Sequence, residues 1–365
     1  MTTAAQRAAA KTKEEAVQRA ATYERVLNFL LPILAVLASF LVGSILLWIL
    51  NVNPIEAYTA LIKGAFGTQR LIITTLLKSI PLIFAGLAVT LAYRGGVFNI
   101  GAEGQLYMGA LLAVWAGTVL ALPYPWHLLV ALLLGVLGGM IWGAIPGYLK
   151  ASRDMNEIIV TILMNYIAIF TVSFFVHGPL KEEGWNTQTP AVAESAQLPI
   201  IWEGTRLHAG FYLALLAVVL VYILLFHTTV GYRIRMVGSN KDAARYVGIK
   251  TTTVMALTMA LSGGLAGLAG ATELLGVQYR LIDNFSPGWG FDAIAVALVG
   301  RLHPVGALLA ALFFGAMRNG ANSMQTAVKI DVVVVYILQG LAIIFLIGGA
   351  SANNRIRRWL EAWKV

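Results

Sequence analysis

The sequence predicts an all-α polytopic membrane protein with about ten membrane-crossing helices. Of its 365 residues, 59% are hydrophobic and only 12% are charged. The mean hydropathy is +0.77, far above that of soluble globular domains. Apolar runs of the length needed to cross a bilayer recur along the chain, because a helix needs about 20 apolar residues to span roughly 30 Å of hydrocarbon.

These runs define the expected elements in order. Full-length apolar runs lie near residues 26–50, 71–93, 105–122, 127–149, 157–177, 210–227, 253–276 and 332–349. Two shorter apolar pieces, 290–300 and 304–319, are expected to form short or partly re-entrant helices. The first 25 residues carry mixed charge, and no small-residue cleavage site follows the first run, so we expect that run to be a retained helix.

Positive charge predicts the orientation, since loops rich in lysine and arginine stay in the cytoplasm. With the amino terminus inside, inner segments would hold 18 of the 26 lysines and arginines, and outer segments seven. Both termini are therefore predicted to be cytoplasmic. The same asymmetry accounts for the net charge of +9. Contact with anionic membrane lipid is enough to explain this charge, so a nucleic-acid partner is poorly supported.

Three parts of the chain are distinguished. Residues 1–25 would form a cytoplasmic tail, residues 26–350 the transmembrane domain, and residues 351–365 a cytoplasmic or interfacial tail. The last part carries an apolar stripe of Ile356, Trp359, Leu360 and Trp363, which suits the membrane interface. An external loop is expected at 178–209, where docking of an extracellular partner and a plain connection stay open as interpretations.

The long inner loop, 228–252, is expected to contain a short helix. Ser239 or Asn240 can cap its start and Gly248 can end it. A loop that only obeyed the charge rule would need nothing beyond its basic residues. A capped helix with small residues on one face instead favours a surface that sits in a groove of another protein.

Glycines predict close helix packing. Gly135, Gly139, Gly143 and Gly147 share one ridge of the run 127–149. Gly263, Gly267 and Ala271 form a similar row in the run 253–276. Small residues at this spacing let two helices approach closely within a membrane.

The stretch Tyr93–Ala110 places polar residues and five glycines inside an apolar chain. Unsatisfied polar groups are expensive in hydrocarbon, so this stretch is expected to be buried in protein or to line a wet route. The glycine-rich stretch Gly276–Gly300 is a candidate counterpart of opposite orientation. Two such units would form an inverted repeat, an arrangement that commonly surrounds a transport path.

The sequence gives no support for an intrinsic enzyme or a metal site. It has no cysteine, its five histidines are scattered, and it contains no G-x-x-x-x-G-K-[ST] loop. We therefore expect no cofactor in this chain. The acidic residues Glu103, Glu157, Glu273 and Asp292 would suit a proton-coupled carrier, but Glu157 and Asp292 lie near expected helix ends, where a carboxylate can simply be a cap.

Five segments together resemble a known family. They are RGGVFNIGAEGQLYMGA, MNEIIVTILMNYIA at 155–168, VGSNKDAARYVGI, SGGLAGLAGATELLG and GWGFDAIAVALVG. In this order they resemble the permease subunits of bacterial ABC importers for simple sugars and nucleosides, of the type II importer class. The first two segments look most like the permeases that work with a nucleoside-binding lipoprotein.

The resemblance implies a bacterial inner-membrane permease dimer, with a second permease subunit favoured over a second identical one. It also implies separate cytoplasmic ATPase subunits, which would bind ATP and magnesium, and an extracellular substrate-binding lipoprotein. The segment Gly238–Ile249 would be the coupling helix seated on the ATPase, through Gly238, Asn240, Asp242, Ala243, Ala244, Tyr246 and Gly248.

Nucleoside import energised by a partner ATPase is therefore the predicted function. The candidate translocation-pathway residues are Asn99, Glu103, Gln105, Asn156, Asn165, Gln278 and Asp292, because amides and carboxylates can contact ribose hydroxyls or base edges. Some of these side chains are also expected to be hydrogen bonds between helices. The alternatives are a simple-sugar importer of the same architecture and a stand-alone proton-coupled carrier.

Overall fold

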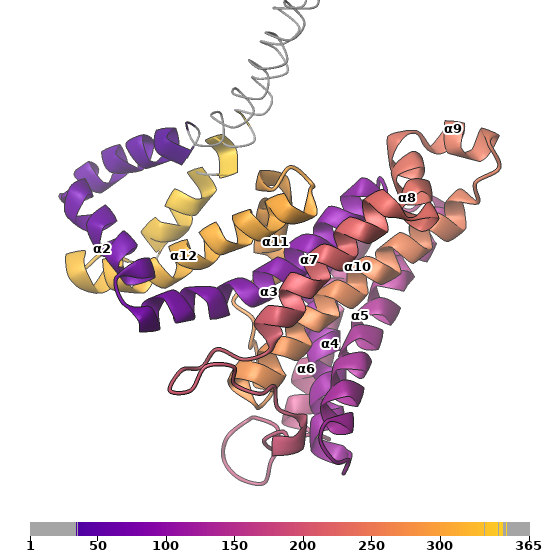
Figure 1. The fold of residues 1–365 in the computed structure, drawn as a ribbon, viewed down its shortest axis with the longest axis horizontal. Coiled ribbons are helices and arrows are strands. Elements are labelled where there is room, and N and C mark those ends of the chain that lie inside the picture. The colour runs from indigo at the N-terminus through magenta and orange to yellow at the C-terminus, as the bar shows by residue number, and fades with distance from the viewer. Residues whose placement is uncertain (1–33, 35, 332, 342, 346–347, 349–365) are drawn as a thin grey trace, which may run out of the picture. The chain divides into compact units, whose positions relative to one another are not determined.

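The computed structural model describes residues 34, 36–331, 333–341, 343–345 and 348. The expected tails 1–25 and 351–365, and the beginning of the first expected helix, lie outside these residues. The described part is mostly helical (Figure 1). Its helices are Val36–Ile49, α2 (Pro54–Phe66), α3 (Gln69–Arg94), α4 (Ala102–Val119), α5 (Trp126–Arg153), α6 (Glu157–His177), α7 (Gly210–His227), α8 (Thr229–Ser239), α9 (Lys241–Tyr246), α10 (Thr251–Glu273), α11 (Trp289–Val299) and α12 (Pro304–Val328), with 333–341 also helical.

Five of the described helices are long and apolar enough to cross a membrane: α3, α5, α6, α7 and α10, the last continuing to Gln278. The count is six if Val36–Ile49 and α2 make one bent span. The predicted membrane protein is thus confirmed at the level of fold class. The chain divides into two compact units, of which Thr59–Met324 holds α3 to α11 and is described below.

The predicted glycine packing is confirmed between α5 and α10. A Cβ atom added to Gly139 would meet the carbonyl oxygen of Gly263 and, at 2.7 Å, the Cα of Gly267. A Cβ atom on Gly143 would lie 2.5 Å from the carbonyl oxygen of Met259. Such contacts are closer than real Cβ atoms tolerate, so any larger residue would push the two backbones apart.

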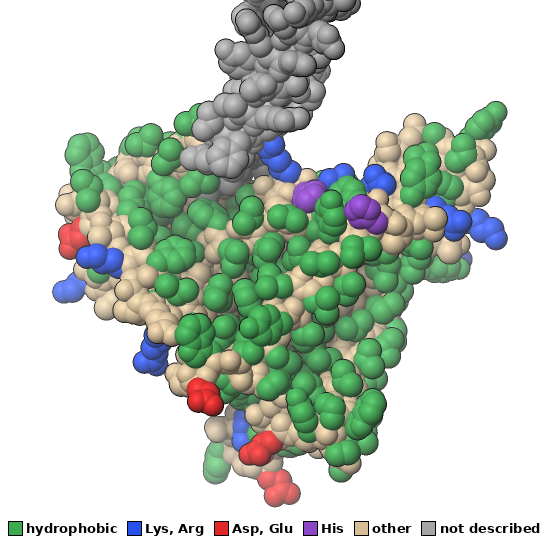
Figure 2. All heavy atoms as spheres, viewed as in Figure 1, with side chains coloured by type: hydrophobic (Ala, Val, Ile, Leu, Met, Phe, Trp, Pro, Cys, Tyr) green, Lys and Arg blue, Asp and Glu red, His purple; other side chains and the backbone are tan. Residues whose placement is uncertain are grey.

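The opposite face of α5 is apolar and exposed. Leu129, Leu133, Leu137 and Ile141 follow one another at four-residue spacing on this face. Helices α6 and α7 expose similar side chains, among them Phe170, Phe174 and Leu220. Figure 2 shows hydrophobic side chains covering much of the visible helical surface, with many charged side chains toward its ends. This distribution is what lipid contact requires.

The connection 178–209 is ordered and bonded to the segment that follows α10. The backbone of Thr189 donates to Leu281 at 3.0 Å, and Val192 donates to Tyr279 at 2.9 Å. A side-chain ion pair joins Glu182 to Arg280. This connection is therefore held across the C-terminal end of α10.

Candidate functional site

The loop before α4 is organised around the buried side chain of Asn99. Its Nδ2 donates to Gln105 Oε1 at 2.8 Å and to Ser262 Oγ at 2.7 Å. Its Oδ1 accepts from Gln105 Nε2 and from the backbone of Gly101, both at 3.0 Å. Ser262 in turn donates to the carbonyl of Ala88 at 2.6 Å. One asparagine thus ties together α3, α4 and α10.

Asn165 on α6 satisfies backbone groups that the break before α4 leaves free. Its Oδ1 accepts from the backbone N–H of Gly104 at 2.8 Å, and its Nδ2 donates to the carbonyl of Ile100 at 2.9 Å. The first turn of a helix has unpaired N–H groups, and in an apolar interior they need such partners. Asn165 therefore holds the interrupted backbone at its break.

Two helix N-termini meet at Glu103. This residue stands in the first turn of α4 and is 2% exposed. Its Oε2 accepts from the backbone N–H of Gly290, in the first turn of α11, at 2.6 Å. A Cβ atom on Gly290 would collide with the backbone nitrogen of Glu103, so only glycine allows this approach. The carboxylate therefore acts as a cap supplied by one helix to the other.

The turn that delivers α11 to this point has its own constraints. Ser286 Oγ accepts from the backbone N–H groups of Gly288 and Trp289 at 3.2 and 3.3 Å. Gly288 has φ +91°, a value that side-chain-bearing residues rarely adopt. The ring of Phe285 packs on Tyr107 of α4 at a centroid distance of 4.7 Å. The polar turn is thereby fixed against α4.

Asp292 and Gln278 are engaged within the protein. Asp292 Oδ2 lies 2.6 Å from Arg318 Nη2, and the same Nη2 donates to the carbonyl of Pro287 at 3.2 Å. Gln278 Nε2 donates to Glu273 Oε1 at 3.1 Å. Arg318 therefore neutralises the carboxylate on α11 and also binds the turn that leads into it.

The structure brings together Asn99, Gln105 and Asn165 around the start of α4, with Glu103 beside them. Gln278 lies on a π-helical turn that ends α10, over Leu274–Gln278. Asn156 stands apart, as the exposed N-cap of α6, where its Oδ1 accepts from Ile158 N at 3.0 Å.

At the opposite end of the helices from the connection 178–209, α9 protrudes (Figure 1). Asn240 caps it, accepting from the backbone of Asp242 at 3.0 Å and of Ala243 at 2.9 Å, which confirms the predicted capped helix. Ala244 is buried, whereas Tyr246 is 94% exposed. The helix thus packs by one small residue and presents an aromatic ring outward.

The ends of the predicted coupling segment differ in surroundings. Gly238 belongs to α8, where an added Cβ would meet the carbonyl of Arg94, so this glycine packs α8 on the end of α3. Gly248 follows α9 with φ +83°, and an added Cβ there would meet open space. Gly238 therefore serves packing, and Gly248 serves the turn out of α9.

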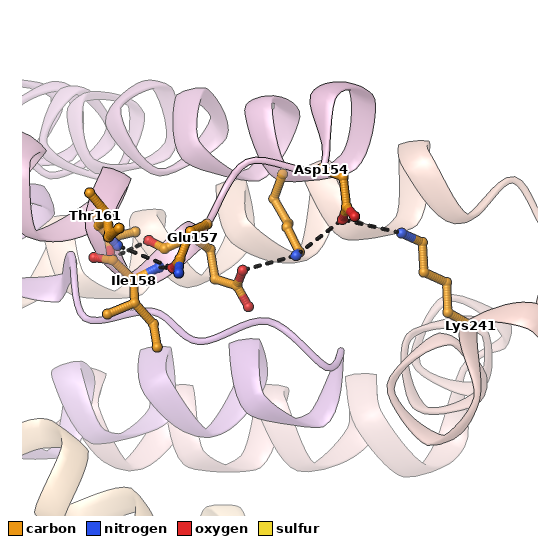
Figure 3. A network of polar contacts seen from close by, with 8 residues as sticks. Asp154, Glu157, Ile158, Thr161 and Lys241 are labelled. Atoms are coloured by element: carbon orange, nitrogen blue, oxygen red, sulfur yellow. Dashed lines mark hydrogen bonds and ion pairs between the residues drawn. The ribbon is translucent and has the colours of Figure 1, made fainter.

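An ionic network joins α9 to the turn between α5 and α6 (Figure 3). Lys150 Nζ lies 3.1 Å from Asp154 Oδ1 and 3.1 Å from Glu157 Oε2. Lys241 Nζ, at the start of α9, lies 4.0 Å from the same Asp154 oxygen. The hydrogen bond from Lys150, followed by the charges of Lys150 and Lys241, lowers the pKa of Asp154. The network therefore connects the start of α9 to the C-terminal end of α5 and the N-terminal end of α6.

Sequence reasoning missed Ser262 and Arg318. An arginine within the apolar piece 304–319 was a usable signal, because a lone charge there requires a partner. Ser262 gave no signal, since small residues in a membrane helix usually serve packing. Within the described residues, no three His, Asp or Glu side chains gather so as to hold a metal ion.

Comparison with known proteins gives a consistent result. The model of the family described as the permease component of branched-chain amino acid transport systems matches residues 71–347. A glucose ABC transporter permease protein of Haloferax volcanii is 37% identical over 87% of this chain and 86% of its own length. The guanosine ABC transporter permease protein NupP of Bacillus subtilis is 37% identical over 88% of this chain and 94% of its own.

A third relative is the nucleoside ABC transporter permease protein NupB of Lactococcus lactis, 34% identical over 81% of this chain and 84% of its own length. No solved structure matches the chain significantly. Because the family model covers most of the chain and the relatives are similar over most of their lengths, the chain belongs to this family of membrane permease components.

Proposed function

We propose that this chain is the permease subunit of an ATP-driven importer of nucleosides and forms one half of its translocation pathway. The observation that carries the proposal is the meeting of two helix N-termini, α4 and α11, at Glu103 and Gly290. Discontinuous helices that meet inside a membrane domain are typical of transporter substrate paths.

An inverted repeat would explain this meeting. In that arrangement α3 with α4 forms one unit, and α10 with α11 forms the other, each with a polar break between a long helix and the next. The helices α4, α11, α12 and 333–341, added to the five or six long spans, would then make a set of about ten. The contacts of Glu103 with Gly290 support the repeat, because they join equivalent points of the two units.

The pathway would run beside the break, lined in part by those of the seven predicted residues that lie near it, which excludes Asn156. The hydrogen bonds of Asn99, Gln105 and Asn165 support a bracing role for these three side chains. Glu103 and Asp292 lie at the N-terminus of α11, where a shift of that helix would exchange their partners. Alternating access would follow from such a shift.

Energy would enter through α9. In this proposal Tyr246 and its neighbours bind a groove of a cytoplasmic ATPase subunit, and closure of the ATPase pair moves the helix. The exposed ring of Tyr246 and the exposed side chain of Val247 support a protein partner, since aromatic side chains are enriched in interface hot spots. The ionic network with Asp154 would transmit that movement to α5 and α6.

Nucleosides are proposed as substrates because two relatives similar over more than four fifths of this chain carry guanosine or nucleoside transport in their names. A glucose permease of equal identity makes simple sugars the second candidate. The other expected parts are a second permease subunit, a pair of ATPases and an extracellular binding lipoprotein, in a bacterial inner membrane with both termini in the cytoplasm.

The experiment is uptake into proteoliposomes that hold the whole complex. ATP inside, with the binding protein outside, should drive accumulation of labelled guanosine but not of labelled glucose. Accumulation of glucose alone would show that the complex is a simple-sugar importer instead. Accumulation that needs a proton gradient and no ATPase would instead identify a stand-alone carrier.

A further inference from the structure

A cavity of about 920 Å³ opens beside the helix break and is lined by no residue assigned above to the pathway. Its walls come from the first turns of α3, from the segment 202–206 of the external connection, and from the ends of α10 and α11. The volume lies in the range of small-molecule sites, roughly 300–1,000 Å³. We refer to it as the outer vestibule.

The vestibule adjoins the meeting point of the two helices. Trp289, the first residue of α11, forms part of its wall and is followed directly by Gly290, which binds Glu103. Glu273 and Val277, at the end of α10, form another part. A solute in the vestibule would therefore touch both the α10 end and the α11 start.

Two kinds of group in the vestibule suit a flat ring that carries hydroxyl groups. The indole of Trp202 is 52% exposed and offers a surface on which a base can stack, and the mostly buried indole of Trp289 forms part of the same wall. The carboxylate of Glu273 accepts from Gln278 through Oε1, which leaves acceptor capacity for hydroxyl donors.

The charges on the wall are nearly balanced, which suits an uncharged solute. Cationic side chains are contributed by Arg70, Lys78 and Arg206, and acidic ones by Glu203 and Glu273. Lys78 is engaged elsewhere, because its Nζ donates to the carbonyl of Arg318 at 3.3 Å. A phosphorylated ligand would need a clear excess of free cationic donors.

We propose that the outer vestibule is a nucleoside-binding station of the permease, in which Trp202 and Trp289 contact the base and Glu273 accepts hydrogen bonds from the ribose hydroxyls. The inference rests on the proposed function and extends it, because it places part of substrate selection in this chain.

The test compares guanosine with 2′,3′-dideoxyguanosine, which lacks the hydroxyl donors, in ATP-driven uptake by the whole complex. Glu273→Gln should lower guanosine uptake efficiency at least about tenfold and remove most of the preference over the dideoxy compound. Trp202→Ala, at an exposed position on the rim, should weaken uptake of both compounds alike. Trp185→Ala is the matched control, since Trp185 is exposed on the same connection and does not line the vestibule.

The outcomes are distinguishable. If the unaltered complex imports guanosine and both vestibule variants behave like Trp185→Ala, the vestibule proposal is wrong and the proposed function stands. If the unaltered complex imports no nucleoside, the proposed function itself fails. Guanosine monophosphate that competes as well as guanosine would overturn the assignment to an uncharged ligand. If each variant complex has the same ATPase activity as the unaltered complex, the variants are correctly folded and assembled.

Discussion

The two longest described connections of the chain differ in how firmly they are bonded to the rest of the protein. The connection 178–209, which is predicted to be external and is called the outer connection below, forms backbone hydrogen bonds from Thr189, Val192 and Leu198 to the end of α10 and the segment after it. The loop 228–252, which is predicted to be internal, contains the small helix α9, and Tyr246 at its end and the C-cap Val247 are 94% and 64% exposed. The first is thus bonded into the fold along much of its length, whereas the second presents an exposed aromatic and an exposed aliphatic side chain.

Replacing the exposed residues of α9 should have the largest effect. The double variant Tyr246→Asp, Val247→Asp should weaken binding of the ATPase subunit by about 1,000-fold, or roughly 4 kcal/mol, if each is a hot spot of about 2 kcal/mol. Co-purification and titration of the ATPase onto the detergent-solubilised permease would measure this.

Trp185→Asp provides the contrasting control on the outer connection. It also places a charge at an exposed aromatic residue, but it should leave ATPase binding unchanged. If this variant lost as much affinity for the ATPase subunit as the α9 double variant, the two connections would not differ in ATPase binding.

Acidification should loosen the outer connection through His208. Burial lowers the pKa of this histidine to about 4, and its Nδ1 accepts from the backbone of Gly210 at 3.1 Å. Unfolded chains bind the proton near the ordinary pKa of about 6.5, so stability is full above that value and declines as the pH falls toward 4. The loss in the free energy of unfolding that is attributable to His208 is about 3 kcal/mol.

Melting of the purified protein between pH 4 and 7, compared with His208→Asn, would measure that decline. The variant should have a clearly flatter profile, because its side chain can accept the same hydrogen bond without titrating. Parallel profiles for the two proteins would assign the acid sensitivity to other groups.

Thr189→Val should have a smaller effect on the same connection. Thr189 Oγ1 accepts from the backbone N–H of Leu281 at 3.0 Å in a buried position. Removing the hydroxyl leaves that N–H without a partner and should cost about 2 kcal/mol of stability. Thr187→Val, at a half-buried position two residues earlier, is the control in a thermal melt. A loss as large in the control would show that exchanging any threonine hydroxyl for a methyl group destabilises this segment, and that the hydrogen bond to Leu281 is not the cause.

Lys241→Ala should have the smallest effect of the series. Its ion pair with Asp154 is long, at 4.0 Å, and exposed. We expect about a twofold fall in ATP-driven uptake at low salt, which disappears as salt screens the pair. Uptake measured at two ionic strengths would check this, and a loss that persists at high salt would mean that Lys241 acts through something other than charge.

Much of the fold could be predicted because membrane helices follow local composition. The runs near 71–93, 127–149, 157–177 and 210–227 became α3, α5, α6 and α7, and the glycine ridge of α5 packs as its spacing predicts. The cap of α9 was also predictable, since capping depends on a residue type at one position.

The partners of the polar residues could not be predicted in the same way. Asn99 bonds to Ser262, and Glu103 to Gly290, across separations of 163 and 187 residues. A sequence gives the donors and acceptors but not which distant backbone will stand opposite them. For the same reason the external connection gave no hint of its bonds to Tyr279 and Leu281.

The meeting of α4 and α11 at Glu103 has a consequence for the integrity of the membrane. Each helix N-terminus carries about half a positive elementary charge, so the two together roughly cancel one ionised carboxylate. The local sum lies between about zero and +1, whether or not Glu103 is protonated. Because neither state is net negative, the junction of α4 and α11 offers a cation no electrostatic attraction, although it contains a buried carboxylate.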